Sequence, residues 1–255
     1  MPPTNQPLTT HPDCRQWGRL ALAFLVSALP SVVQASVTDV IYDASSTSKS
    51  TSAVSSLSWS HVVGSAADRL LVVGVSIANS STCDGGDNLN ICEVESITFN
   101  GVALTIAQAN NSSDNALRVE HWGLVAPNNA TANIVVTMKT GDSAVLVTGA
   151  VSFANVVQVG PVRGSGCAQS TDDFLSVAPS ATRLRDAVID TFAIPGNSTS
   201  VALFPGSAQT QRWNDATGSS AADVWGGGST RSSPGFAVSM DWSLGSTVTT
   251  FHCVL

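Results

Sequence analysis

Two consecutive segments of opposite pattern constrain the fold of this chain most strongly. In residues 57–63, large side chains alternate with small polar ones, which is the period of two of a strand with one buried face. In residues 70–75 nearly every side chain is apolar, as in a strand covered on both faces. Residues 64–68 between them are small and polar and predict a connection. Residues 57–77 therefore predict the nucleus of a layered all-β domain.

Short apolar runs and turn signals continue along the rest of the chain. Hydrophobic residues make up 43% of the sequence and charged residues 11%, which excludes a disordered composition. Asn100 and Gly101 lie between two apolar runs and predict a hairpin, because both turn positions need a positive φ. Other strands are expected at residues 37–42, 93–99, 117–125, 132–138, 145–153, 186–194, 209–213, 236–242 and 248–254.

The polar segments between these runs predict loops. Residues 44–56 are rich in Ser and Thr, and residues 219–233 contain three consecutive glycines. Residues 160–182 predict a long crossing connection, and the last two strands suggest a hairpin across Gly245. No helical periodicity and no internal repeat is evident. The expected fold is an antiparallel β-sandwich of one domain, jelly-roll-like in topology.

The N-terminal segment has the pattern of a signal peptide. Arg15 and Arg19 precede an apolar run at residues 20–29, and Pro30 and small residues at 33–35 follow it. The run is shorter than the roughly 20 residues of a membrane-spanning helix. We expect residues 1–35 to be removed and residues 36–255 to form the exported domain. The predicted location is secreted or cell-surface.

The cysteines fit an exported chain. Of five, one lies in the predicted signal peptide, and Cys83, Cys92, Cys167 and Cys253 remain. An even number of cysteines in an exported protein predicts disulfides. Three pairings can be drawn. We favour Cys83–Cys92, which closes a short polar loop, and then Cys167–Cys253 by elimination. A metal site is the alternative, but the sequence has no CxxC spacing.

Charge and acidic clusters limit the partners. The formal net charge is −7 with only 11 Lys and Arg, which argues against a nucleic-acid partner. Asp84, Asp87 and Asn88 share a loop with two glycines, and oxygen-rich loops of this kind bind calcium. Their spacing differs from an EF-hand loop, so a solvated, disulfide-closed loop is the alternative. Calcium is the one cofactor that the sequence suggests.

Several blocks together resemble a β-sandwich domain that recurs in secreted and cell-surface bacterial proteins, mostly of unassigned function. These blocks are SLSWSHVVG, RLLVVGVSI, ESITFNGVALT, RVEHWGLVAP, TANIVVTM and GAVSFANVVQ. The resemblance covers residues 37–157 well and the remainder loosely. It implies a jelly-roll-like sandwich in an extracellular setting, and it implies no catalytic residues. Because the blocks are mostly core pattern, the resemblance concerns the fold more than the activity.

No constellation of residues predicts catalysis. The sequence lacks a G-x-S-x-G nucleophile elbow and a recognisable pair of catalytic carboxylates. His61, His121 and His252 each lie in a strand pattern, which is typical of packed, hydrogen-bonded histidines. We therefore expect a protein that is not an enzyme.

Aromatic residues in polar loops suggest a binding surface. Trp213 and Trp225 lie in polar, Gly-rich surroundings and are candidates for stacking on sugar rings, with burial under a loop as the alternative. Trp59 and Trp242 follow strand alternation and are expected in the core. The leading hypothesis is a non-catalytic exported protein for adhesion or surface interaction, with glycans or cell-surface proteins as partners. The alternatives are a carbohydrate-binding module and a structural subunit that self-associates through an edge strand such as residues 37–42.

Overall fold

The computed structural model describes residues 39–81, 83, 90–198 and 203–255. In this part of the chain it contains seventeen strands and no helix, and every strand pair is antiparallel. The antiparallel all-β prediction is confirmed, while the jelly-roll topology stays a prediction. The described residues accordingly include no helix long and apolar enough to cross a membrane.

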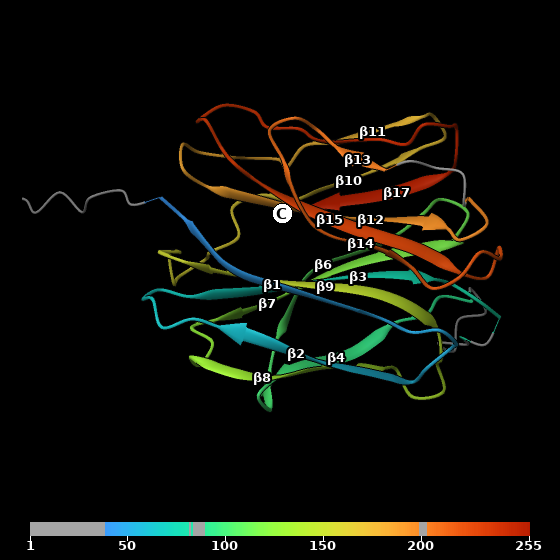
Figure 1. Cartoon of the computed structure of the whole chain (residues 1–255), viewed down its shortest axis with the longest axis horizontal. Helices are drawn as coiled ribbons and strands as arrows, with labels where there is room; N and C mark the ends of the chain where they lie inside the picture. Colours follow the sequence, from blue (N-terminus) through green and yellow to red (C-terminus); the bar gives the residue numbers. More distant parts are fainter. Residues whose placement is uncertain (1–38, 82, 84–89, 199–202) are drawn as a thin grey trace, which may run out of the picture. The chain divides into compact units, whose positions relative to one another are not determined.

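The N-terminal half forms a sandwich of two sheets (Figure 1). The first inner sheet has the order β1-β9-β3-β7-β6, and the first outer sheet has the order β2-β8-β4-β5. Their strands are β1 (Ile41–Lys49), β2 (Ser56–Val63), β3 (Leu70–Ala78), β4 (Val94–Phe99), β5 (Val102–Ala103), β6 (Thr105–Asn111), β7 (Leu117–Val125), β8 (Ala130–Met138) and β9 (Val145–Ala154).

The C-terminal half forms a second sandwich. The second inner sheet has the order β10-β17-β12-β15-β14, and the second outer sheet has the order β11-β16-β13. Their strands are β10 (Gly166–Ser170), β11 (Phe174–Val177), β12 (Ala187–Pro195), β13 (Phe204–Pro205), β14 (Thr210–Ala216), β15 (Val224–Ser232), β16 (Met240–Ser243) and β17 (Thr250–Val254).

The two sandwiches repeat one strand order. If β10, β11 and β12 are matched to β1, β2 and β3, and β14 to β17 are matched to β6 to β9, the two inner sheets have the same order. The outer sheets match in the same way, with β13 in the place of β4. The chain from Val37 to Leu255 is one compact unit, yet it contains a duplicated topology. No internal repeat is evident in the sequence, so the repeat is one of topology.

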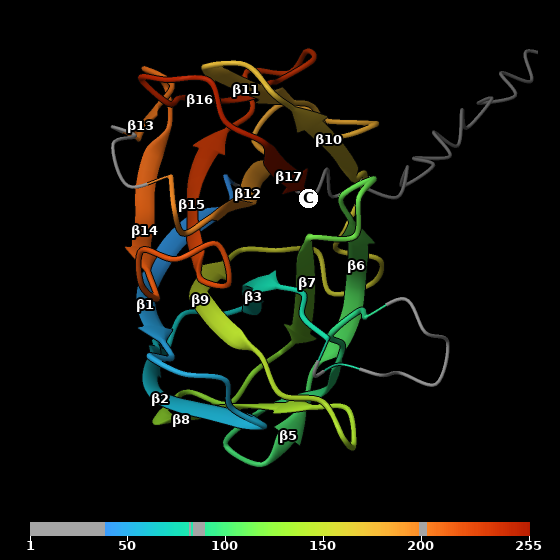
Figure 2. The same ribbon diagram turned by 90° about the vertical axis from the view of Figure 1, so that its right-hand side faces the viewer.

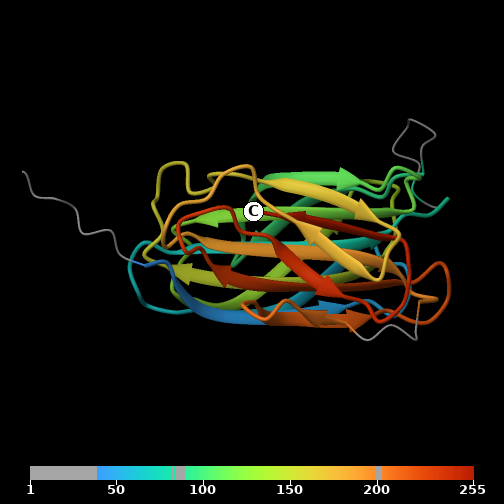
Figure 3. The same cartoon turned by 90° about the horizontal axis from the view of Figure 1, so that it is seen from above.

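The four sheets stack as layers, with the inner sheets facing each other (Figure 2). Each gap between layers holds an apolar core. Ile97 of the first outer sheet packs in one core with Val73 of the first inner sheet, and Val72 of that same sheet packs in the next core with Ile189 of the second inner sheet. Figure 3, viewed from the side of the second outer sheet, shows long strands of successive layers running broadly side by side.

The opening segments behave as their patterns predict. In β2, Trp59, His61 and Val63 are buried and the intervening residues are exposed. In β3 all nine residues are buried, because the strand is central in its sheet and that sheet is covered on both faces. The hairpin at Asn100 and Gly101 is also confirmed, and both residues have a positive φ.

Several loop predictions are wrong. Residues 44–49 belong to β1, whose polar side chains suit a half-exposed edge strand. Residues 219–233 include β15, and its glycines are buried because neighbouring side chains occupy the space of their missing Cβ atoms. Residues 160–182 contain β10 and β11 as well as the connection between the sandwiches. The last two strands do not form a hairpin, since β16 and β17 lie in different sheets.

Candidate functional site

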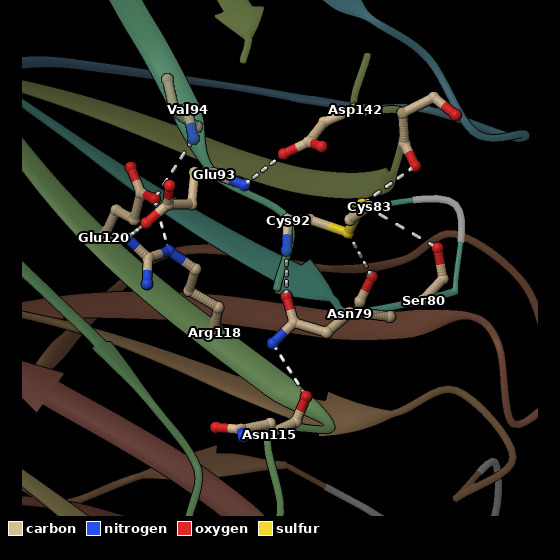
Figure 4. Close-up of a disulfide and its surroundings, with 12 residues drawn as sticks. Asn79, Ser80, Cys83, Cys92, Glu93, Val94, Asn115, Arg118, Glu120 and Asp142 are labelled. Carbon is tan, nitrogen blue, oxygen red and sulfur yellow. Dashed lines mark hydrogen bonds and ion pairs between the residues drawn. A yellow bond between two sulfur atoms is a disulfide. The ribbon is translucent and has the colours of Figure 1, made fainter. Parts of the chain in front are cut away.

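Glu120 is a buried carboxylate in the first sandwich, held by three donors. It has no exposed surface, and it accepts hydrogen bonds from Arg118 Nε at 2.6 Å, Trp122 Nε1 at 2.7 Å and Val94 N at 3.3 Å. Figure 4 shows Glu120 with Arg118 and Val94 near the Cys83–Cys92 disulfide. Buried charges need such partners to offset lost hydration. Glu120 thus has a structural role.

Asp190 of β12 is a buried carboxylate of the second sandwich. It accepts hydrogen bonds from Ser229 Oγ at 2.9 Å and Trp242 Nε1 at 2.8 Å, and His252 Nε2 lies 3.0 Å from its Oδ2. All four side chains are fully buried or nearly so. The Asp190–His252 pair therefore connects strands inside the core, with no surface on which a substrate could lie.

The other two histidines in the described chain are also buried. His61 Nδ1 lies 2.8 Å from Ser46 Oγ, and Trp59 Nε1 donates to the same hydroxyl. Neither ring nitrogen of His121 has a partner among the described residues. Burial lowers the pKa of each imidazole from 6.5 to about 4, because a low-dielectric interior disfavours the charged form. Both rings are packing residues that stay neutral near pH 7.

Trp213 is buried, so the prediction that it is an exposed stacking residue is wrong. Only 2% of its surface is exposed, and it packs in the core between the two inner sheets. Cβ atoms on Gly149 and Gly228 would collide with its ring. A register shift in β14 between Gln211 and Trp213 accompanies the inward position. Of its polar neighbours, Asn214 contacts Trp225, whereas Arg212 and Asp215 contact Tyr42 and Lys49 of β1.

Trp225 does not share a surface with Trp213. It is half-buried, packs against the core between the second inner and outer sheets, and donates a hydrogen bond from Nε1 to Asn214 Oδ1 at 2.5 Å. The two rings thus lie on opposite faces of the second inner sheet. The prediction that these two tryptophans form one binding surface is wrong.

Both predicted disulfides are present in the structure. Cys83 pairs with Cys92 and Cys167 pairs with Cys253, with Cα–Cα distances of 4.8 Å and 4.1 Å. Around the first, Asn79 Oδ1 accepts a hydrogen bond from Cys92 N at 3.0 Å (Figure 4). The calcium candidates Asp84, Asp87 and Asn88 lie outside the described residues. Within the described ranges there is no group of three or more His, Cys, Asp or Glu side chains that could hold a metal ion.

A cavity of 350 Å³ lies where the two sandwiches meet, which we call the junction cavity. The connection from β9 to β10 (residues 155–165, at the left of Figure 1) and the segment from β11 to β12 (residues 178–186) frame it. Its floor is apolar and is drawn from both halves of the chain. Floor residues include Leu70, Val72, Phe153, Val156 and Ile189. A cavity of this size and lining is typical of a small-molecule site.

The rim of the junction cavity exposes apolar side chains. Val157, Val162 and Leu184 line it and expose 63%, 42% and 57% of their surface. Phe236 is 68% exposed and close by, since its carbonyl oxygen accepts a hydrogen bond from the rim residue Thr182. Single exposed apolar residues need no explanation, but a group around an apolar cavity marks an interaction site.

Three arginines stand at this rim, and two have acidic partners. Arg163 Nε lies 3.0 Å from Asp186 Oδ2, and Arg185 Nε lies 3.1 Å from Asp39 Oδ1. Arg183 is exposed, and its main-chain N–H donates to Asp186 Oδ2. Its guanidinium has no hydrogen-bond or ion-pair partner among the described residues. The junction cavity therefore joins an apolar floor to one uncompensated cation.

The surroundings of the cavity were not recognisable in the sequence. Val157, Val162 and Leu184 lie in connections without periodic pattern, and the floor residues carry ordinary strand signals. Exposed valines in a connection are the one local signal that could have been noticed. Comparisons with protein families, curated proteins and solved structures found no match for this chain. The candidate site therefore rests on geometry alone.

Proposed function

We propose that this chain is a non-catalytic exported protein that acts by adhesion or surface interaction, and that the junction cavity with its rim is the contact site. The observation that carries the proposal is the coincidence of an apolar cavity with exposed apolar side chains around it. Export is supported by the two disulfides, which form and persist in oxidising compartments.

The distribution of polar groups favours binding over catalysis. The buried carboxylates Glu120 and Asp190 are occupied by donors inside the sandwiches. The charged groups that line the junction cavity are Arg163, Arg183, Arg185 and Asp186. None of these is a paired nucleophile and base, which acyl transfer or hydrolysis would need. An apolar cavity with a few polar groups at its mouth suits recognition.

Selective adsorption tests the proposal. The compact unit Val37–Leu255 should adsorb to an alkyl-coated sensor surface and take up the neutral dye Nile red, whose fluorescence rises in apolar sites. The double variant Val157→Asp, Leu184→Asp places charges on the rim and should remove most of both signals. The matched control Val62→Asp, Ile106→Asp changes exposed apolar residues on β2 and β6 and should leave both signals unchanged. Equal losses in the two double variants would count against the proposal.

A glycan-binding module is the second candidate, on a surface different from the one predicted. Phe174 of β11 and Phe204 of β13 both pair with Ser243 of β16, so they flank it on the outer face of the second outer sheet. They expose 48% and 64% of their surface. Two aromatic rings beside hydroxyl groups suit sugar stacking. Glycan-array binding that is lost in Phe174→Ala, Phe204→Ala and retained in Trp225→Ala would favour this candidate.

A further inference from the structure

We infer that the junction cavity binds an aliphatic carboxylic acid, with its chain on the apolar floor and its carboxylate at Arg183. This inference rests on the proposed function, because it names the ligand class of the same site. The ligand is taken as the free acid in solution, bound one molecule at a time. Three features of the cavity support it: the floor, the unpaired cation and the number of cations left for the head group.

The floor specifies the body of the ligand. Leu70, Val72, Val156 and Ile189 are branched aliphatic side chains, and Phe153 adds one ring. All five belong to the core between the inner sheets, and each keeps less than a tenth of its surface exposed. A hydroxylated ligand would leave its polar groups without partners on this floor, at a cost for each one. An alkyl chain has no such groups.

The unpaired guanidinium specifies the charge of the ligand. Arg183 is the cavity-lining cation for which the described chain supplies no acidic partner, while Arg163 and Arg185 are each within 3.1 Å of an aspartate. The chain as a whole is acidic, with a net charge of −7, so a free guanidinium at an apolar cavity is a local exception. A guanidinium presents parallel N–H donors that match both oxygens of a carboxylate.

The rim also distinguishes a carboxylate from a phosphate head group. Arg163 and Arg185 are each paired with an aspartate, so Arg183 is the lining guanidinium without an ion-pair partner among the described residues. A singly charged carboxylate matches this one guanidinium. A phosphate that carries nearly two charges would need a second free cation, and the described rim provides none.

Calorimetric titration of the unit Val37–Leu255 with straight-chain acids tests the inference. Octanoate, nonanoate, decanoate and undecanoate, each below its micelle concentration, should bind with affinities that rise about fourfold per methylene. A buried methylene contributes about 0.8 kcal/mol, and about 1.4 kcal/mol is a tenfold change in affinity. The rise should stop once the chain fills the cavity. Decanol should bind less tightly than decanoate.

Variants separate the head group from the chain. Arg183→Gln should weaken decanoate binding about fivefold, the upper range for a solvent-exposed ion pair, and should leave decanol unchanged. Lys139→Gln removes a positive charge directly after β8, at a residue that does not line the cavity, and should change the binding of neither ligand.

Each other outcome overturns a defined part of the proposal. Equal affinities for decanoate and decanol, with no effect of Arg183→Gln, would refute the carboxylate and leave the proposed contact site standing. Binding to vesicles of an anionic phospholipid with no binding of the free acids would refute the free-acid ligand in favour of a membrane surface. If decanoate, decanol and Nile red all fail to bind, both this inference and the proposed function would be overturned.

Discussion

Trp213 packs in the core between the two sandwiches, and replacing it by alanine should destabilise the whole unit. Its side chain is 98% removed from solvent, in the core between the inner sheets. Substitution of a buried aromatic side chain by alanine costs about 3–5 kcal/mol. The walls of this slot include Gly149 and Gly228, which have no side chains to fill the space. We therefore expect Trp213→Ala to cost about 4–5 kcal/mol.

Packing accounts for this cost rather than hydrogen bonding. The indole Nε1 of Trp213 has no partner among the described residues, so the variant removes no hydrogen bond. For a domain of this size, about 1 kcal/mol corresponds to about 2–4 °C, so the melting temperature should fall by about 10–15 °C. Guanidinium denaturation gives the free energy of unfolding and thermal denaturation gives the melting temperature. Far-ultraviolet circular dichroism follows both transitions without relying on tryptophan fluorescence.

Two comparison variants make the prediction refutable. Trp225 is half-buried, and Trp225→Ala should cost about half as much as Trp213→Ala. Gly149→Ala should cost about 1–3 kcal/mol, because its Cβ would collide with the Trp213 ring. That cost should shrink when Gly149→Ala is combined with Trp213→Ala, since the ring is then absent. A cost below about 1 kcal/mol for Trp213→Ala, or additive costs in the double variant, would show that the indole does not fill this slot in solution.

Three further predictions concern buried groups and the disulfides. Asp190→Ala should cost about 3–5 kcal/mol in guanidinium denaturation, because it leaves the Trp242 and Ser229 donors unpaired in the core. Stability should fall as the pH falls from 6.5 to about 4, because His61 and His121 have folded pKa values of about 4 and the unfolded chain takes up their protons first. The free energy of unfolding should fall by up to about 1.4 kcal/mol per pH unit for each histidine, and this slope should halve in His61→Gln. A free energy of unfolding that does not change over this pH range would contradict the burial of the two histidines. Removal of Cys167–Cys253 should cost more than removal of Cys83–Cys92, about 4.5 against about 2.5 kcal/mol, since the bridges span 86 and 9 residues. Paired Cys→Ser variants compared in denaturant would decide the order, and a reversed order would refute the chain-entropy explanation.

Much of the first sandwich could be predicted from sequence because its strands obey strong patterns. Residues 117–125 alternate and form β7 with the expected bounds. Asn100 and Gly101 form the turn that the sequence predicts, and both residues have a positive φ there. The disulfides followed from an even cysteine count and loop length. These features are local, so one segment of sequence is enough to reveal them.

The second sandwich was harder because its strands break local rules for reasons that lie far away in the chain. Three consecutive glycines normally indicate a loop, but in β15 they make room for Ser76, Phe192 and Trp213. The polar sequence around Trp213 suggested exposure, yet the facing sheet that covers it comes from the other half. A single sequence does not show which surface will be covered by a second sandwich.

The duplicated topology explains why the junction cavity exists at all. A sandwich of this kind has one outer sheet, and its inner sheet needs a cover, because β3 is apolar on both faces. The second sandwich provides that cover with its own central strand, β12, and the apolar faces meet along most of their length. At one end the chain passes from β9 to β10 through residues 155–165. This connection crosses the boundary between the two sandwiches and lines the cavity there without filling it. Leu70 from one half and Ile189 from the other are thereby left side by side on a cavity floor. The candidate site is thus a property of the pair, and neither sandwich alone would contain it.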